Sequence, residues 1–485
     1  MFRLLVSAVV SFPLGAAILG AGLGASLGAC NKKDPEANAP QPATERAADP
    51  AAGPVAEACA KAKPDGAVAW IEDDYAAALA CAKARGVPLV LDFWAPWCHT
   101  CLSMKSTVFA DPSLAEEGAR FVFAALDTDK EVNAAAVAKF PLSAWPTFYV
   151  VGHDETVLSR FVGAASLAQF RAFLDAGRTA LAGADGAARH LLAAERAIAA
   201  KDLATAEREL TAALDAAPAG WVRTPDALVS LLHTRRKRGD AAGCLELAER
   251  RLDDTGHAAS ATDFVGLALD CASSIAATDA ARATAFRERA IARLSKLLDD
   301  PRAQLSTDDR SDAMVYLRTV LDEVGRTSDA HELAERQRAL LADAIAKAAE
   351  PRAAMTFNWQ LAEVCVYLGR PLDAVPALEA SAKALPDEYD PPARLGWVLL
   401  KGGRLDEAAR WTDKAIALAY GPRKARVLGQ RAEIAAAQGD VAAERTYREQ
   451  VVALWESLPP GQANPDALAK ARHALARLAP PAVTP

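Results

Sequence analysis

The sequence predicts an α/β domain over residues 64–180, followed by an all-α array of helical repeats over residues 185–480. Two observations support this division. Half of the 30 aromatic residues lie within residues 64–180, where apolar runs of strand length alternate with helical patterns. The region that follows is rich in alanine and leucine, and short breaks at glycine and aspartate separate its apolar helical patterns.

The composition limits the classes of protein to which this chain can belong. A length of 485 residues suits about three domains, or one domain with an extended array. The net charge of −7 argues against a basic nucleic-acid binder, so no nucleic-acid partner is expected. A hydrophobic fraction of 52% excludes wholesale disorder. Eight cysteines are too few for a disulfide scaffold of this size.

Residues 1–29 are typical of an export signal. Arg3 supplies one positive charge, and residues 4–29 contain no charged side chain. The stretch ends in Leu-Gly-Ala followed by Cys30, which resembles the lipobox of bacterial lipoproteins. That resemblance implies cleavage before Cys30 and lipidation of this residue. The alternative is an uncleaved transmembrane helix, although Pro13 and several glycines weaken it.

Either anchor would leave the remaining chain outside the cytoplasm, on a membrane surface. The expected location is the bacterial cell envelope, facing the periplasm. Asn31 favours the outer membrane, because it replaces the aspartate that retains some lipoproteins at the inner membrane. Residues 30–63 are rich in alanine, proline and charge, and are expected to form a semi-extended tether. No later segment is long and apolar enough to span a membrane.

The elements of the α/β domain follow from local patterns. Residues 87–94 form a near-continuous apolar run that suits a buried parallel strand, and Gly86 before it is a typical helix end. Residues 152–155 carry a hairpin signal between two further strands. In order, we expect a helix at 74–85, a strand at 87–94, a helix opening at residue 98, strands at 121–127, 147–151 and 158–162, and a helix at 166–176.

The chemistry of this domain centres on Cys98 and Cys101. Two cysteines three apart at the start of a helix can form a small disulfide. The first sulfur would lie near the positive end of the helix dipole, which lowers the pKa of a thiol and produces a nucleophilic thiolate. The second would resolve the mixed disulfide. A zinc site is disfavoured because the sequence has no second CxxC and no nearby pair of histidines, so no metal is expected.

These motifs resemble the thioredoxin family, and they cover about a quarter of the chain. Residues 90–101, Val-Leu-Asp-Phe-Trp-Ala-Pro-Trp-Cys-His-Thr-Cys, are close to the strand and active-site turn of that family. Residues 145–147, Trp-Pro-Thr, match its cis-proline loop, and residues 161–164 match its late glycine. Residues 109–113 are more similar to the C-terminal domain of the transmembrane thiol:disulfide interchange proteins. The resemblance implies a thioredoxin-like fold.

The resemblance also assigns roles to individual residues. Cys98 would be the attacking thiolate and Cys101 the resolving thiol. Asp92 matches the buried acid of the family, with a raised pKa that lets it exchange a proton with Cys101; the alternative is a strand-end aspartate open to water. Pro146 would lie beside the disulfide in the cis form, and the Trp145 backbone would pair with an extended substrate.

Three positions leave the mechanism open. Trp97, like Trp94, either shields the sulfurs and contacts substrate or only packs in the core. The lysine that thioredoxins often place near the buried acid maps to about Phe123. His99 can stabilise the thiolate and favour an oxidising potential, or can be an exposed residue of modest effect. The resemblance to the interchange proteins favours reduction, whereas His99 would favour oxidation. The direction of electron flow therefore stays open.

The C-terminal region resembles tetratricopeptide repeats. Gly369 and Gly403 are 34 residues apart, which is the length of that repeat, and small residues recur at fixed distances from both. Small residues let helix pairs approach closely, and neighbouring pairs complete the core. About eight to nine units are expected, against the alternative of an irregular helical domain. The resemblance implies a concave surface that binds protein partners.

Five cysteines remain. Cys59 and Cys81 could form a structural disulfide in an oxidising compartment, or Cys81 could be a small buried helix residue. A bridge between Cys244 and Cys271 is possible, and Cys365 occupies an alanine-like helical position. The sequence leaves these pairings open.

The sequence therefore predicts a membrane-anchored extracytoplasmic thiol–disulfide oxidoreductase. Its partners would be protein thiols and disulfides, together with a membrane or soluble redox protein as electron source or sink. No cofactor is expected beyond the redox-active Cys98–Cys101 disulfide. The competing class is a non-catalytic binding scaffold in which the repeats are the functional part. A third possibility is a domain that serves only another redox protein on the same membrane.

Overall fold

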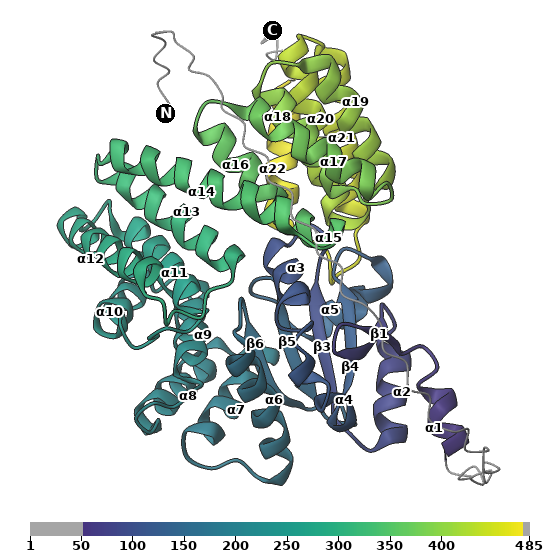
Figure 1. The fold of residues 1–485 in the computed structure, drawn as a ribbon, viewed down its shortest axis with the longest axis vertical. Helices are drawn as coiled ribbons and strands as arrows, with labels where there is room; N and C mark the ends of the chain where they lie inside the picture. Colours follow the sequence, from purple (N-terminus) through teal and green to yellow (C-terminus); the bar gives the residue numbers. More distant parts are fainter. Residues whose placement is uncertain (1–51, 479–485) are drawn as a thin grey trace, which may run out of the picture. The chain divides into compact units, whose positions relative to one another are not determined.

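The computed structural model describes residues 52–478 (Figure 1). The expected signal peptide at residues 1–29, the lipidation site Cys30 and most of the expected tether lie outside the described residues. The described residues belong to one compact unit. No helix of the part that the structure describes is both long and apolar enough to cross a membrane.

The N-terminal half of this unit holds a six-stranded mixed sheet with the order β1-β2-β4-β3-β5-β6. The strands are β1 (Lys63–Asp65), β2 (Val68–Glu72), β3 (Leu89–Trp94), β4 (Val122–Asp127), β5 (Thr147–Val151) and β6 (Val157–Val162). Strands β2, β4 and β3 are parallel, β5 pairs antiparallel with β3, and β6 pairs antiparallel with β5. The four strands expected from the sequence are present, each within two residues of its expected bounds.

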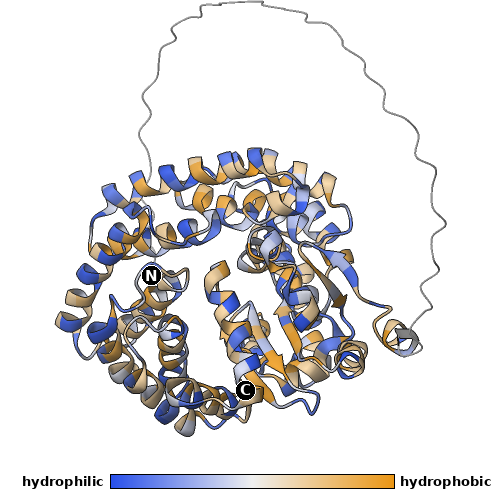
Figure 2. Ribbon diagram, turned by 60° about the horizontal axis from the view of Figure 1, so that its bottom comes forward, coloured by the Kyte–Doolittle hydropathy of each residue, from blue (hydrophilic) through white to orange (hydrophobic). Residues whose placement is uncertain are grey.

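Helices cover both faces of the sheet, so alternate side chains of one strand enter different cores. Val90 packs in a cluster with side chains of α3 (His99–Ser106) and α6 (Leu167–Ala182), whereas Leu91 packs with those of α2 (Tyr75–Arg85) and α5 (Ala134–Lys139). All six residues of β3 and of β4 are buried. Burial on two faces explains why these strands are continuous apolar runs (Figure 2).

Local signals set the ends of the helices. Asp74 caps α2 by accepting the Ala77 N–H at 2.8 Å, and Gly86 ends this helix in the left-handed conformation with φ 66°. Ser166 and Gln169 form a capping box at the start of α6. This helix continues to Ala182, six residues past the expected end, because Gly177 lies against Val150 of β5 and Ala180 packs against the same apolar cluster.

The fold begins earlier than the boundary expected at residue 64. Within the expected tether, Ala52–Ala58 form α1, and Cys59 after it is bonded to Cys81 of α2. Strand β1 then pairs antiparallel with β2. The composition of residues 30–63 suggested no buried core, but a covalent link and edge pairing hold the last dozen of these residues on the domain.

Two short helical segments, α4 (Glu117–Arg120) and η1 (Pro112–Leu114), precede β4, and η2 (Glu131–Asn133) precedes α5.

The remaining chain is all α-helical, as expected. Its helices are α7 (Gly186–Ala199), α8 (Leu203–Ala216), α9 (Thr224–Lys237), α10 (Ala241–Arg251), α11 (Ala261–Ile275), α12 (Ala280–Asp299), α13 (Thr307–Glu323), α14 (Thr327–Lys347), α15 (Pro351–Met355), α16 (Asn358–Tyr367), η3 (Pro371–Ala374), α17 (Val375–Ala384), α18 (Asp390–Lys401), α19 (Leu405–Leu418), α20 (Gly421–Gln438), α21 (Val441–Ser457) and α22 (Pro465–Ala476).

These helices pair as in tetratricopeptide repeats, but the spacing is uneven. Gly369 and Gly403 lie in the turns of two successive pairs with φ 71° and 75°, which explains their 34-residue separation. Pairs begin at residues 186, 224, 261, 307, 358, 390 and 421. Residues 186–457 therefore hold seven helix pairs rather than the eight to nine expected, because α12, α14 and the connections after them lengthen the middle pairs.

Small side chains line the contacts between the helices of each pair. Ala206, Ala362 and Ala408 are fully buried, and Gly396 leaves no room for a Cβ beside the Thr412 hydroxyl. The prediction of close packing through small residues is confirmed. Two large apolar clusters run through the array, one across α7–α14 and one across α14–α20.

The array begins on the edge of the sheet. The Arg196 side chain of α7 donates to the Val157 carbonyl of β6 at 2.9 Å. Arg223, at the start of α9, donates to the Arg160 carbonyl at 3.1 Å and pairs with the buried Glu195 at 3.0 Å. The array thereby covers an edge strand that would otherwise present unpaired backbone groups.

Candidate functional site

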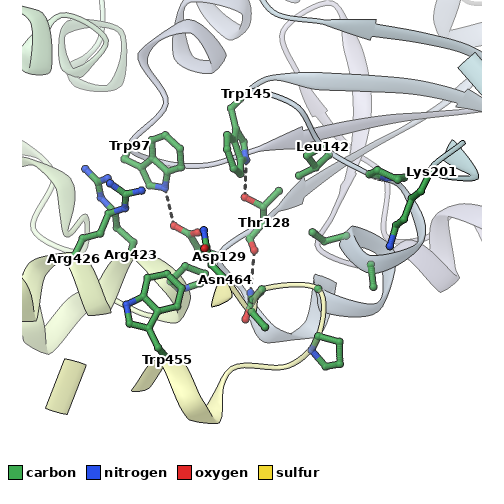
Figure 3. Close-up of a pocket in the computed structure, with 18 residues that line it drawn as sticks. Trp97, Thr128, Asp129, Leu142, Trp145, Lys201, Arg423, Arg426, Trp455 and Asn464 are labelled. Carbon is green, nitrogen blue, oxygen red and sulfur yellow. Dashed lines mark hydrogen bonds between the residues drawn. The ribbon is translucent and has the colours of Figure 1, made fainter. Parts of the chain in front are cut away.

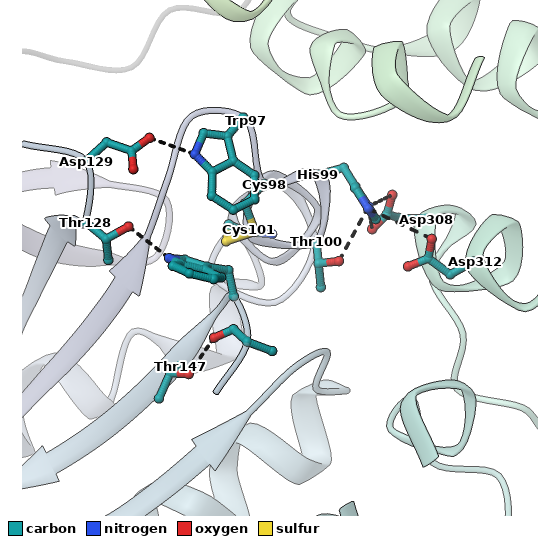
Figure 4. The surroundings of a disulfide bond; sticks show 12 residues. Trp97, Cys98, His99, Thr100, Cys101, Thr128, Asp129, Thr147, Asp308 and Asp312 are labelled. Atoms are coloured by element: carbon teal, nitrogen blue, oxygen red, sulfur yellow. Dashed lines mark hydrogen bonds and ion pairs between the residues drawn. A yellow bond between two sulfur atoms is a disulfide. The ribbon is translucent and has the colours of Figure 1, made fainter. Parts of the chain in front are cut away.

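Cys98 and Cys101 lie where β3 turns into α3 and are joined by a disulfide (Figure 4). Cys98 is the N-cap of α3, and its Sγ accepts the backbone N–H of Cys101 at 3.0 Å. The sequence folds this way because the apolar run of β3 ends at Ala95-Pro96-Trp97, a turn that presents Cys98 at the free N–H groups of the helix. In the reduced protein those groups would stabilise a Cys98 thiolate.

Both sulfurs are largely covered. Cys98 is 5% exposed and Cys101 is 2% exposed. Met355, the last residue of α15, belongs to the same buried cluster as both cysteines. Helices α13 and α15 pack against α3 (Figure 1). The array therefore covers the turn that carries the cysteines.

Asp92 lies in the middle of β3 and is 2% exposed, so its side chain is not open to water. Burial raises its pKa to about 7, against the opposing effect of the positive charge on Lys105. Its Oδ1 has no hydrogen-bond partner within the described residues. A carboxyl with this pKa exchanges its proton readily at neutral pH.

Lys105 was missed by the analysis of the sequence. The position where the resemblance suggested a lysine is occupied by Phe123, which is buried in the core. Lys105 lies one helical turn after Cys101, with its Nζ 3.9 Å from the centre of the Trp94 ring. The spacing of four residues from Cys101 could have indicated that this lysine faces the buried acid.

Two tryptophans flank the disulfide. The Trp145–Pro146 peptide bond is cis, as the resemblance implied, and the Pro146 carbonyl accepts the Gly163 N–H at 3.0 Å. The Trp145 side chain is 37% exposed, and its indole donates to the Thr128 hydroxyl at 2.9 Å. Its ring lies 5.3 Å from that of Trp97. This exposed indole and the backbone beside it remain available to a ligand.

His99 contacts the array, and its side chain is 23% exposed (Figure 4). Its Nδ1 lies 3.0 Å from a carboxylate oxygen of Asp308, and its Nε2 lies 4.0 Å from Asp312. Burial lowers the pKa of His99, but Asp308 and Asp312 outweigh burial and raise it to about 10. His99 is thus an imidazolium between two carboxylates. No pattern could have revealed this contact, because 209 residues separate His99 from Asp308.

The same three side chains are a set of potential metal ligands, with ligand atoms within 4.8 Å of one another. Two carboxylates and one imidazole suit a divalent cation. A metal would have to displace a proton from His99, whose raised pKa opposes that exchange. In the structure the three side chains form an ion pair, and binding of a cation would require His99 to lose its proton.

Further polar contacts join the array to α3 and to the loop after β6. The Asp263 carboxylate accepts the Ala164 N–H at 3.3 Å, beside the late glycine of the family pattern. Burial, followed by the charges of Asp309 and Asp312, raises the pKa of Asp263 to about 8. The Ser103 hydroxyl of α3 donates to Ser306, the N-cap of α13, at 3.2 Å.

The C-terminal helices contact the loop after β4. The Tyr389 hydroxyl donates to Asp129 at 3.2 Å, and the Gln462 amide donates to the Thr128 carbonyl at 2.9 Å. The Tyr420 hydroxyl donates to Asp127. These contacts bring the last turns of the array beside Trp97 and Trp145.

A pocket of about 390 Å³ opens between that loop and the end of the array (Figure 3). Trp97 and Trp145 line one side, with Arg423 and Arg426 beside Trp97, and Trp455 lies across from them. Both tryptophans that flank the disulfide line this pocket. The sequence did not identify any of the array residues in this pocket as a candidate site residue.

The other cysteines are also placed. Cys59 is bonded to Cys81, and Cys244 is bonded to Cys271, so the structure selects one of the alternatives for each pair. Cys365 is buried without a partner, and burial raises the pKa of its thiol to about 11. A thiol with that pKa is inert at neutral pH.

Comparisons with known proteins agree with this architecture. Residues 75–178 match the family model of the thioredoxin-like domain. A tetratricopeptide repeat protein from Parabacteroides merdae is 14% identical over 60% of this chain and 98% of its own, with a TM-score of 0.39. MamA from Desulfovibrio magneticus is 16% identical over 39% of this chain and 96% of its own, with a TM-score of 0.25. Residues 75–178 thus form a thioredoxin-like domain, and the region that follows consists of paired helices.

Proposed function

We propose that this protein is a membrane-anchored, extracytoplasmic thiol–disulfide oxidoreductase that reduces disulfides of protein substrates. The observation that carries the proposal is the Cys98–Cys101 disulfide at the N-terminus of α3, beside the cis Trp145–Pro146 bond. A disulfide that closes so small a ring at a helix start suits repeated opening and closing. The buried Asp92 supplies a proton acceptor near neutral pH.

The reaction would follow two exchange steps. The Cys98 thiolate of the reduced protein attacks one sulfur of a substrate disulfide, forming a mixed disulfide and releasing the other sulfur as a thiolate. Cys101 then loses its proton to Asp92 and attacks the Cys98 sulfur, which releases the second substrate thiolate. Two electrons pass from the dithiol to the substrate, and the Cys98–Cys101 disulfide forms. A membrane or soluble dithiol protein would reduce this disulfide again.

The environment of His99 supports the reducing direction. A free imidazolium beside Cys98 would stabilise the thiolate and make the pair more oxidising. Here Asp308 and Asp312 compensate the charge of His99, with the nearer carboxylate at 3.0 Å. The argument for an oxidase therefore loses its main support. The resemblance to the interchange proteins, which favours a reductase, remains.

The anchor and the array complete the proposal. Lipidation at Cys30 after cleavage of residues 1–29 would hold the protein at the outer membrane, with its folded part in the periplasm. The helical repeats would select or position protein substrates. The contacts between the array and the loop after β4 support this role, because substrates that bind the array would lie close to the Cys98–Cys101 disulfide.

Reduction of insulin by the purified full chain, with dithiothreitol as the reductant, tests the proposed activity. We expect precipitation of the released insulin chains, and we expect Cys98→Ser to abolish it. Cys365→Ala is the matched control, because it removes an unreactive thiol far from the redox turn. Absence of turnover, or equal turnover by Cys98→Ser, would show that the protein is not a reductase. Cys101→Ser should leave substrates covalently attached to Cys98 and so identify them.

One observation favours a second candidate, a scaffold that binds proteins without exchanging disulfides. Helices α13 and α15 of the array pack against α3, and Cys98 is only 5% exposed. A scaffold would retain its partners when Cys98 and Cys101 are both replaced by serine, and would never form mixed disulfides. Capture from envelope extracts by the full chain and by this double variant distinguishes the two functions.

A further inference from the structure

The pocket beside Trp97 and Trp145 carries an excess of positive charge. Arg423, Arg426 and Lys201 line it, whereas Asp129 is the acidic side chain among its lining residues. Asp129 already accepts hydrogen bonds from the Trp97 indole at 2.7 Å and from Tyr389 at 3.2 Å. The chain as a whole has a net charge of −7, so a basic pocket departs from its average surface.

Among the described residues, neither arginine makes an ion pair shorter than 3.9 Å, although the charge of Asp129 acts on both. Arg423 stacks over the Trp97 ring at 5.1 Å, and its nearest carboxylate oxygen, on Asp390, is 3.9 Å away. Arg426 makes no ion pair within 4 Å in the part of the chain that the structure describes. Burial and the charge of Arg423 lower the pKa of Arg426. Both side chains project from the first turns of α20, where the helix dipole adds positive potential.

The walls of the pocket suit a side chain with a short apolar stem. Trp97 and Trp145 form one side, and Trp455 of α21 faces them (Figure 3). A volume of about 390 Å³ accommodates one or two side chains of an extended peptide. An anionic carboxylate could reach the arginines while its methylene groups contact the indoles.

We infer that this pocket binds an acidic side chain, glutamate or aspartate, close to the cysteine of a protein substrate. Trp97 immediately precedes Cys98, and Trp145 immediately precedes the cis Pro146, so a peptide at the disulfide would pass the mouth of the pocket. The inference rests on the proposed exchange activity and specifies its substrates. The array would then contribute to sequence preference through α20 and α21, in addition to any binding elsewhere.

Single-turnover reduction of small peptides tests the preference. Each peptide carries one cysteine in a mixed disulfide with a coloured aromatic thiol, and glutamate, glutamine or lysine at one of the three positions on either side. The pre-reduced full chain attacks the peptide sulfur, and release of the coloured thiolate reports the reaction. At one or more positions we expect half-saturation at about fivefold lower concentration for glutamate than for glutamine, and a further loss for lysine.

Matched variants locate the effect. Arg426→Gln should abolish the preference for glutamate, because this guanidinium makes no ion pair within 4 Å, among the described residues, that the substitution would break. Arg410→Gln, on the exposed face of α19, removes the same charge outside the pocket and should preserve the preference. The preference should also weaken as salt rises. Equal half-saturation for the three peptides at every position, or a preference unchanged in Arg426→Gln, would overturn the inference.

Binding without exchange separates this inference from the proposed activity. The same peptides with serine in place of cysteine cannot react, and tryptophan fluorescence of the full chain reports their binding through Trp97, Trp145 and Trp455. A glutamate preference in binding, with no release of coloured thiolate, would refute the reductase and support the acidic-residue pocket. Release from all three peptides with no preference in either measurement would support the reductase and refute the pocket.

Discussion

Asp92 shows how burial changes the pKa of a single group. The folded protein holds the Asp92 proton more tightly than the unfolded chain does, because burial raises the pKa to about 7. The ionised form is therefore destabilising. Relative to the unfolded chain, the folded state loses stability as pH rises from the ordinary aspartate range through about 7.

We predict that Asp92→Asn raises the free energy of unfolding above pH 8 by about 3 kcal/mol and changes it little near pH 4. Urea unfolding of the oxidised protein at the two pH values measures this difference. The same substitution should slow the release of mixed disulfides from Cys98 and flatten the rise of that rate around pH 7. Asp65→Asn, at an exposed position of β1, is the control. Equal stabilisation at both pH values would contradict the prediction.

The pair of His99 and Asp308 should contribute stability with the opposite dependence on pH. The pKa of His99 is raised to about 10, so its contribution is complete below the ordinary histidine range and disappears as pH rises through about 10. We predict that Asp308→Asn lowers the free energy of unfolding at pH 7 by about 2 kcal/mol, and by less above pH 10. Urea unfolding at both pH values checks this.

Glu209→Gln is the matched control for that pair. It removes a carboxylate 2.8 Å from His190, but both side chains of this pair are partly exposed. Its effect at pH 7 should therefore be smaller, within about 1 kcal/mol. If Asp308→Asn lowers the free energy of unfolding equally at both pH values, the ion pair with the His99 imidazolium does not account for the stabilising effect of Asp308.

At the scale of elements, α1 depends on a covalent link. This helix precedes the sheet by only a few residues, and Cys59 after it is bonded to Cys81 across 22 residues of sequence. The composition of the segment suggested a tether because too few apolar residues are present to hold it. The disulfide reduces the entropy of the unfolded chain and so compensates for the small apolar contact.

We predict that replacing Cys59 and Cys81 together by alanine lowers stability by about 3 kcal/mol, the entropic effect of a loop of this length. Thermal unfolding of the full chain measures the shift. Limited proteolysis should then cut within residues 52–63 while the sheet stays intact. The Cys98–Cys101 exchange activity should persist, because the sheet and α3 do not require α1. Unchanged proteolysis would show that β1 alone holds the segment.

At the scale of the whole molecule, the array limits access to the sulfurs. Met355 packs in the cluster of Cys98 and Cys101. We predict that Met355→Ala increases the rate at which a small alkylating reagent modifies the reduced protein by severalfold, because it opens space above the thiols. Mass spectrometry of Cys98 over time measures the rate. Met314→Ala removes an equally buried methionine from the core of α13 and should leave the rate unchanged.

Local patterns were sufficient for much of the fold and part of the site. The helix before Gly86, the four strands and the turn that carries Cys98 depend on hydrophobic runs and turn residues that act over a few positions. The number of helix pairs was overestimated, because a fixed period cannot reveal that individual helices such as α14 are longer. The start of the fold was placed too late, because a disulfide partner is not a property of local composition.

The sequence by itself determined where the two cysteines lie. The spacing of Cys98 and Cys101 after a buried strand places both at the start of a helix, within reach of a small disulfide. Only the tertiary structure decided what lies around that disulfide. The partners of His99 and the arginines beside Trp97 come from helices more than 200 residues away. Their positions depend on the rotations that accumulate between successive helix pairs, and no local pattern encodes that sum.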